Sequence, residues 1–99
     1  MRVRLLDQAK ADLVELGQYY REVGSDLLAR KMIARIKQPV LLLKDMPEVG
    51  APYELAPGVR RLLVASGIFL VFYRVRADVE VLHIRRAERS PATTDDFEP

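Results

Sequence analysis

The stretch GVRRLLVASGIFLVFYRVRADVEVLHIRR, residues 58–86, decides the fold because it contains three short apolar runs in succession. β-Branched and aromatic residues fill these runs, which is typical of strands. The pairs Ser66-Gly67 and Ala77-Asp78 separate the runs, and pairs of this kind are typical of hairpin turns. Residues 68–73 are apolar on both faces, which indicates a central strand that helices cover on at least one side. The stretch therefore predicts an antiparallel meander with strands near 60–65, 68–76 and 79–86.

Two amphipathic helices precede the meander. Apolar residues recur at spacings of three and four from Ala9 to Val23 and again from Leu28 to Leu43, which places them on one face of each helix. Because only Gly24-Ser25 separates the helices, we expect an antiparallel hairpin. Before them, Val3 and Leu5 alternate with arginines and predict a short strand. The sequence thus predicts an α+β fold with an N-terminal strand, an antiparallel helix hairpin and a three-stranded antiparallel meander that together form one sheet.

Polar and special residues predict where the helices begin and end. We expect Asp7 and Ser25 to cap the two helices through their side-chain oxygens. Gly24 is expected to end the first helix with a positive φ. Pro39 is expected to kink or break the second helix, at a cost of about 3 kcal/mol, before it resumes as far as Met46. Residues 47–57 contain three prolines and predict a loop outside the sheet.

The composition predicts one globular domain at residues 1–90. The 99 residues include no cysteine, which excludes disulfides and thiolate chemistry. No apolar run approaches the roughly 20 residues of a membrane span, and Asp7 interrupts any signal-peptide core, so we expect a cytoplasmic protein without a membrane partner. Residues 91–99 form an acidic segment without periodicity, which is expected to be flexible.

The body of the chain is more basic than its formal net charge of +2 suggests. Three of the 14 acidic residues lie in the last nine positions, so residues 1–90 contain 16 basic and 11 acidic side chains, a balance of +5. Most of the basic residues are arginines, whose planar guanidinium group binds phosphate or carboxylate through two hydrogen bonds. The charge therefore favours a polyanionic partner.

Three motifs follow one another after the strand and the helix hairpin: MPEVG at 46–50, PGVR at 57–60 and FYRV at 72–75. In this order they resemble the RelE/ParE superfamily of bacterial toxins over nearly all of residues 1–90. The resemblance implies a type II toxin–antitoxin module, in which an antitoxin from the same operon silences the toxin. It also implies two alternatives, because RelE-like toxins cut mRNA in the ribosome whereas ParE-like toxins poison DNA gyrase without a hydrolytic site.

The end of the last strand favours the ParE-like branch. Many relatives have a His-Gly/Ala-x-Arg pattern there, whereas this chain has Arg86-Ala87-Glu88-Arg89. Arginine stays protonated near neutral pH and cannot act as a general base. We therefore expect a gyrase inhibitor with no catalytic residue, metal or cofactor, which can contact DNA indirectly and is neutralised by a ParD-like antitoxin. The alternatives are a RelE-like ribosome-dependent mRNA endoribonuclease and a member that only binds an antitoxin.

Two sets of residues are candidates for binding partners. The arginines at the start and end of the meander are expected to bind the target, although its antiparallel course predicts that the two groups lie at opposite ends of the sheet. As an alternative, they only solvate the sheet and protect its edges. Apolar residues off the main helix stripe are expected to bind the antitoxin. The target-binding set is Arg60, Arg61, Arg85, Arg86 and Arg89, and the antitoxin-binding set is Leu27, Ile33, Leu41 and Leu42.

The remaining polar candidates favour structural roles. His83 is the one histidine and is expected to be a partly buried structural residue. Tyr73 is expected in the core with its hydroxyl hydrogen-bonded. Of Tyr19 and Tyr20, one is expected to face the core and the other solvent. The acidic residues of the first helix are expected to form a solvated face; these are Asp7, Asp12, Glu15 and Glu22.

Overall fold

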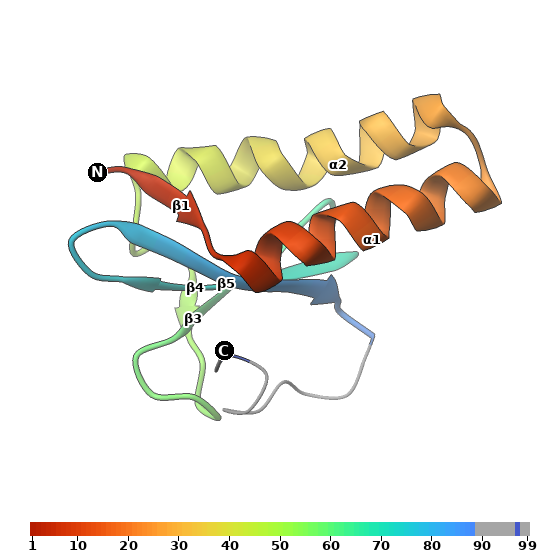
Figure 1. Cartoon of the computed structure of the whole chain (residues 1–99). Helices are drawn as coiled ribbons and strands as arrows, with labels where there is room; N and C mark the ends of the chain where they lie inside the picture. Colours follow the sequence, from red (N-terminus) through yellow and green to blue (C-terminus); the bar gives the residue numbers. More distant parts are fainter. Residues whose placement is uncertain (89–96, 98–99) are drawn as a thin grey trace.

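The computed structural model describes residues 1–88 and 97, and it confirms the predicted α+β fold and its order of elements (Figure 1). Within this part of the chain no helix is long and apolar enough to cross a membrane. The elements are β1 (Val3–Leu5), α1 (Asp7–Val23), α2 (Asp26–Leu41), the 3-10 helix η1 (Leu42–Lys44), β2 (Ala51–Pro52), β3 (Arg60–Val64), β4 (Phe69–Val75) and β5 (Val79–Arg86).

The strands form a single five-stranded sheet in the order β1-β5-β4-β3-β2. The meander pairs antiparallel as predicted, but β1 runs parallel to β5, with Val3 opposite Val79, so the sheet is mixed. The prediction of a loop at 47–57 is wrong for β2, where Ala51 pairs with Arg61. Pro52 is tolerated there because β2 is an edge strand, and one side of an edge strand needs no backbone donor.

The helix hairpin covers one face of the sheet, and the main core lies between the two layers (Figure 1). Tyr73 is fully buried in this core, and its hydroxyl accepts a hydrogen bond of 2.8 Å from the Gly50 backbone N–H, which confirms the prediction for this residue. A Cβ atom at position 50 would lie 2.7 Å from that hydroxyl and from the carbonyl of Arg61. Gly50 is therefore required by close packing at this point. Tyr20 packs against the core and Tyr19 is 42% exposed, as expected.

A smaller apolar cluster occupies the opposite face of the sheet. Phe72 and Leu82 form its centre, and Ala56 and Val59 from the segment before β3 cover them. The ring of Phe97 lies 5.1 Å from that of Phe72. The other residues of the expected flexible segment, 91–96 and 98–99, lie outside the described part of the chain.

The helix ends agree only in part with the sequence signals. Ser25 caps α2 as predicted, since its Oγ accepts a 3.0 Å hydrogen bond from the N–H of Leu28. Asp7 is instead the first residue of α1, where its charge still interacts favourably with the helix dipole. Gly24 has a φ of −141°, so the expected positive φ is wrong. A glycine suits this position for another reason: a Cβ atom would lie 2.4 Å from the Leu28 side chain.

Pro39 lies inside α2 without ending it. The helix continues to Leu41, so a break at Pro39 is wrong, and η1 then extends the helical structure to Lys44, two residues short of the expected Met46. Proline removes one backbone hydrogen bond of the helix. Ile36 and Val40 on either side of it are buried in the core, and this packing holds the backbone in helical form.

The side chain of Asp12 connects α1 to the edge of β5. Pairing between β1 and β5 ends with the hydrogen bond from the Leu6 N–H to the Val81 carbonyl. Beyond that point, Asp12 Oδ2 accepts a 2.9 Å hydrogen bond from the backbone N–H of Ile84 and lies 2.6 Å from Nδ1 of His83. The Asp12 carboxylate thus accepts a hydrogen bond from the edge of β5 beyond the point where its pairing with β1 ends.

Asp12 is 6% exposed, so its prediction as part of a solvated face is wrong. The expected burial of His83 is confirmed at 8% exposure. A bulge in β5 brings the two together, because Phe72 pairs with His83 while Tyr73 pairs with Val81, which leaves Leu82 as the extra residue.

Burial and hydrogen bonding shift the pKa of Asp12 in opposite directions. Burial raises the pKa of its carboxyl group, but the hydrogen bonds from His83, the Ile84 N–H and the Gln8 side chain together lower it below its ordinary value. The ionised carboxylate is therefore the form that the native structure stabilises.

We predict that Asp12→Ala lowers the free energy of unfolding by about 1–3 kcal/mol, because the Ile84 N–H and the His83 ring lose their buried acceptor. The measurement is urea denaturation of the wild type and the variant. The matched control is Glu15→Ala, an exposed position on the same helix, which is expected to change stability by less than about 0.5 kcal/mol. Equal losses of unfolding free energy in the two variants would show that the buried carboxylate of Asp12 does not stabilise the fold.

The lowered pKa also predicts acid lability. A carboxyl group with a lower pKa in the folded state stabilises that state fully above its unfolded pKa, and this contribution is lost as the pH falls through the folded pKa. The difference in unfolding free energy between the wild type and Asp12→Asn is therefore expected to be constant near neutral pH and to shrink below about pH 4. Urea denaturation at a series of pH values measures it, and a difference that does not change with pH would rule out this linkage.

Candidate functional site

The arginines at the two ends of the meander lie apart in the structure. Arg60 pairs with Tyr73 on β4, whereas Arg86 pairs with Phe69 at the other end of the same strand. Each adjacent pair is also divided between the two faces of the sheet, because neighbouring strand residues point to opposite sides. The structure therefore confirms the expected separation and brings no single phosphate pocket together.

The five arginines differ in their surroundings. The Arg60 guanidinium donates hydrogen bonds to the carbonyls of Gly50 (2.8 Å) and Glu48 (3.3 Å), so it holds the segment that leads into β2. Arg85 is buried and Arg61 is exposed. Arg89 lies outside the described residues.

Arg86 is held against α1 by aromatic rings. Its guanidinium carbon lies 4.3 Å from the centre of the Tyr19 ring and 5.7 Å from that of Tyr20, which is the geometry of a cation–π interaction. Its hydrogen bond with Tyr19 is the main cause that raises the pKa of Arg86 above its ordinary value, although desolvation acts against it. Arg86 is thus a fixed cation that can bind an anionic group but cannot accept a proton.

The pair of Asp12 and His83 has the composition of a general base and the carboxylate that orients it. The His83 ring is nevertheless stacked on Phe72, with centroids 6.2 Å apart and an angle of 19°, and the ring of Phe97, a neighbour of Phe72, lies 6.3 Å away. This packing favours a structural role. Among the described residues, no group of three His, Cys, Asp or Glu side chains is placed to bind a metal ion.

The sequence contained a signal for Asp12 that the prediction did not use. Asp12 lies three residues after Ala9 and four before Leu16, at the spacing of the apolar stripe itself. A charged residue within such a stripe is buried only with a partner, which predicts a long-range contact but does not identify His83.

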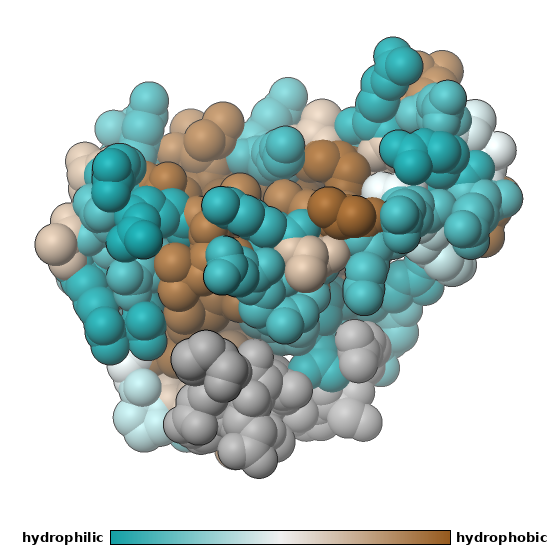
Figure 2. Space-filling view, in the orientation of Figure 1, coloured by the Kyte–Doolittle hydropathy of each residue, from teal (hydrophilic) through white to brown (hydrophobic). Residues whose placement is uncertain are grey.

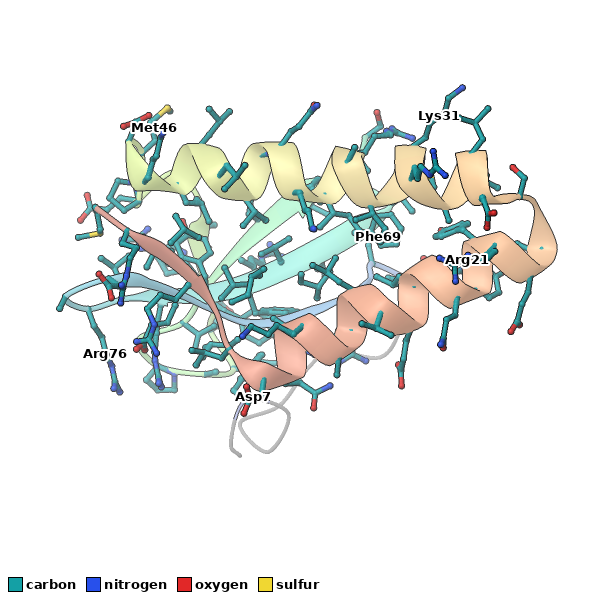
Figure 3. All side chains as sticks on the ribbon, turned by 45° about the horizontal axis from the view of Figure 1, so that its top comes forward. Asp7, Arg21, Lys31, Met46, Phe69 and Arg76 are labelled. Carbon is teal, nitrogen blue, oxygen red and sulfur yellow. The ribbon has the colours of Figure 1, made fainter. Side chains whose placement is uncertain are left out.

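A groove of about 1130 Å³ is open between β1, the first half of α1 and the second half of α2. Figures 1 and 3 show these three elements around it, and Figure 2 shows apolar side chains gathered between hydrophilic ones on this side of the molecule. Basic side chains also border it, namely Arg2, Arg4, Lys10, Lys37 and Arg74. Its apolar lining includes Val3, Leu5, Leu13, Ile36, Val40 and Leu41.

The four predicted antitoxin-binding residues lie in different places. Leu41 lines the groove and is 60% exposed. Leu27 and Leu42 are exposed to a similar degree but lie on α2 and η1 outside the groove. Ile33 is half-buried and faces Gly17 of α1. The structure therefore brings one of the four to the groove.

Known proteins match nearly the whole chain. The family model for the ParE toxin of the type II toxin–antitoxin system parDE matches residues 3–91. Y4kP of Sinorhizobium fredii is 32% identical over 88 residues, which cover 89% of this chain and 90% of that protein. Toxin ParE1 of Caulobacter vibrioides is 33% identical over 82 residues, which cover 82% of this chain and 83% of that protein.

A solved structure agrees with the family match. A chain of the chromosomal ParDE toxin–antitoxin system from P. aeruginosa has a TM-score of 0.80 and 28% identity, covering 89% of this chain and 97% of that one. The family match extends over the strand, the helix hairpin and the meander. This protein therefore belongs to the ParE toxin family of type II toxin–antitoxin systems.

Proposed function

We propose that this protein inhibits DNA gyrase and that a ParD-like antitoxin neutralises it. The observation that carries the proposal is the match to the ParE toxin family over residues 3–91. Arginine at position 86, where many relatives have histidine, supports the choice of gyrase, and a gyrase inhibitor would act in the cytoplasm.

The side chains near the end of β5 support inhibition by binding. Arg86 is a fixed cation on the Tyr19 ring, and His83 is packed against the rings of Phe72 and Phe97. A fixed cation suits contact with an acidic protein surface, since charged groups at an interface direct association and orientation. Arg86 therefore contributes to target binding rather than to bond cleavage.

We predict that the purified protein stops supercoiling by gyrase and traps cleaved plasmid DNA. Arg86→Ala is expected to weaken this inhibition about tenfold, because one charge-assisted contact of about 1–3 kcal/mol is lost. The measurement is a titration of the protein against gyrase, plasmid and ATP. The control is Arg76→Ala, an exposed arginine beyond the other end of β4, which is expected to leave inhibition unchanged.

Two outcomes would contradict the choice of gyrase. One is normal supercoiling, without trapped cleaved DNA, at excess toxin. The other is codon-specific cleavage of mRNA in a translation reaction that is lost in Arg86→Ala, which would favour the endoribonuclease. Expression without growth arrest would indicate a member that only binds an antitoxin.

We also propose that the antitoxin binds in the groove between β1, α1 and α2. Its lining is apolar and its border carries Lys10 and Lys37, both exposed. An amphipathic helix with an apolar face and acidic neighbours is complementary to such a surface. The related structure from P. aeruginosa is of a ParDE system, which agrees with an antitoxin partner.

We predict that Leu41→Ala weakens binding of the cognate antitoxin about tenfold, because a groove-lining apolar side chain is truncated. Isothermal titration calorimetry measures the affinity. Leu42→Ala is the matched control, since Leu42 is next in sequence and 59% exposed against 60% for Leu41, but lies outside the groove. Equal affinities of the two variants would show that the antitoxin binds elsewhere.

A further inference from the structure

The net positive charge of the described chain comes from α2 and η1. Residues 1–88 and 97 include 15 of the 16 Lys and Arg, because Arg89 lies outside them, and 11 of the 14 Asp and Glu. The segment from Asp26 to Lys44, which is α2 and η1, contains five basic residues and one acidic residue. The rest of the described chain therefore has ten of each sign, and the whole excess of four positive charges lies on α2 and η1.

Ion pairs strengthen this contrast. Several arginines elsewhere lie close to carboxylates, as for Arg2 with Asp78 at 3.1 Å, and for Arg4 with Glu80 at 3.6 Å, a carboxylate that Arg74 and Arg76 share. Asp26, the one acidic residue of α2, pairs with Arg21 of α1 at 2.8 Å. No ion pair to a described carboxylate involves any of the five basic residues of the segment, which are Arg30, Lys31, Arg35, Lys37 and Lys44.

These five side chains are exposed, because the apolar side of α2 is turned toward the core. Arg30, Lys37 and Lys44 recur every seven residues, which places them along one flank about 10 Å apart. Lys31 points away from the sheet in Figure 3, and α2 forms the outer surface of the molecule in Figure 1. The result is an exposed row of cations along a rigid helix about 24 Å long.

We propose that the outer face of α2 and η1 binds the phosphate backbone of duplex DNA. A row of cations with no carboxylate of its own is complementary to regularly spaced phosphates, and binding releases counterions from the DNA. A lipid surface fits less well, because the exposed leucines of this segment stand at its two ends, Leu27 and Leu28 at one and Leu41 and Leu42 at the other, with no exposed large apolar side chain between them. The contact is independent of DNA sequence and does not depend on gyrase as the target.

Fluorescence anisotropy with a labelled 20-base-pair duplex, without gyrase or antitoxin, tests this proposal over a range of salt concentrations. The variant Arg30→Gln/Lys31→Gln/Lys44→Gln removes three charges from the proposed surface. It is expected to bind at least about tenfold more weakly, and the slope of log Kd against log salt is expected to fall by about three. The matched control Arg2→Gln/Arg4→Gln/Arg76→Gln removes three charges outside the proposed surface, which lie beside Asp78 and Glu80, and is expected to bind like the wild type.

Thermal unfolding of each variant establishes that it is folded. If the wild type does not bind the duplex at about 0.1 M salt, the proposal is overturned. Equal losses of DNA affinity in the two triple variants would also overturn it, because they would show an effect of net charge alone. DNA binding that survives in the α2 variant while antitoxin binding is lost would assign this face to a protein partner and also overturn it. Gyrase inhibition without DNA binding would reject this inference and leave the proposed function in place.

Discussion

The carboxylate of Asp12 takes the place of a strand at the edge of β5, and the position of α1 depends on it. β1 pairs with only the first residues of β5, so the remaining edge presents a backbone N–H at Ile84 that needs an acceptor. Asp12 supplies it from α1 and also contacts His83. Since this bond fixes the first half of α1 beside the sheet, it also shapes the groove that α1 forms with β1 and α2, and it keeps Tyr19, two turns further on, beside Arg86.

The basic residues serve two different purposes. Those of the sheet are mostly used within the molecule: Arg60 binds backbone carbonyls, Arg4 binds Glu80, and Arg86 stacks on Tyr19. Those of α2 and η1 have no described carboxylate to neutralise them, although the sequence alone drew attention to the meander. The segment of α2 and η1 thus carries five exposed cations without a described carboxylate partner, and such cations attract an external anion.

The groove and the basic face of α2 are neighbouring surfaces with different chemistry. Apolar residues line the groove, which suits burial of a partner helix, whereas the outer face of α2 carries exposed cations, which suit a hydrated phosphate backbone. Lys37 belongs to both surfaces. An antitoxin helix seated in the groove would therefore lie beside the proposed DNA contact, and its acidic side chains would compete with phosphate for the same cation.

The order of strand, helix hairpin and meander follows from the sequence by itself, because apolar spacing and turn pairs such as Ser66-Gly67 act over a few residues. The cap at Ser25 and the burial of Tyr73 follow for the same reason. Only the tertiary structure decided that β1 lies parallel to β5, that a bulge at Leu82 turns His83 toward Asp12, and that Pro52 lies in a strand. These features depend on contacts between distant segments, and Asp12 and His83 are 71 positions apart. The lack of a carboxylate partner along α2 also depends on the fold, since contacts between distant segments bring Arg2 to Asp78 and Arg4 to Glu80.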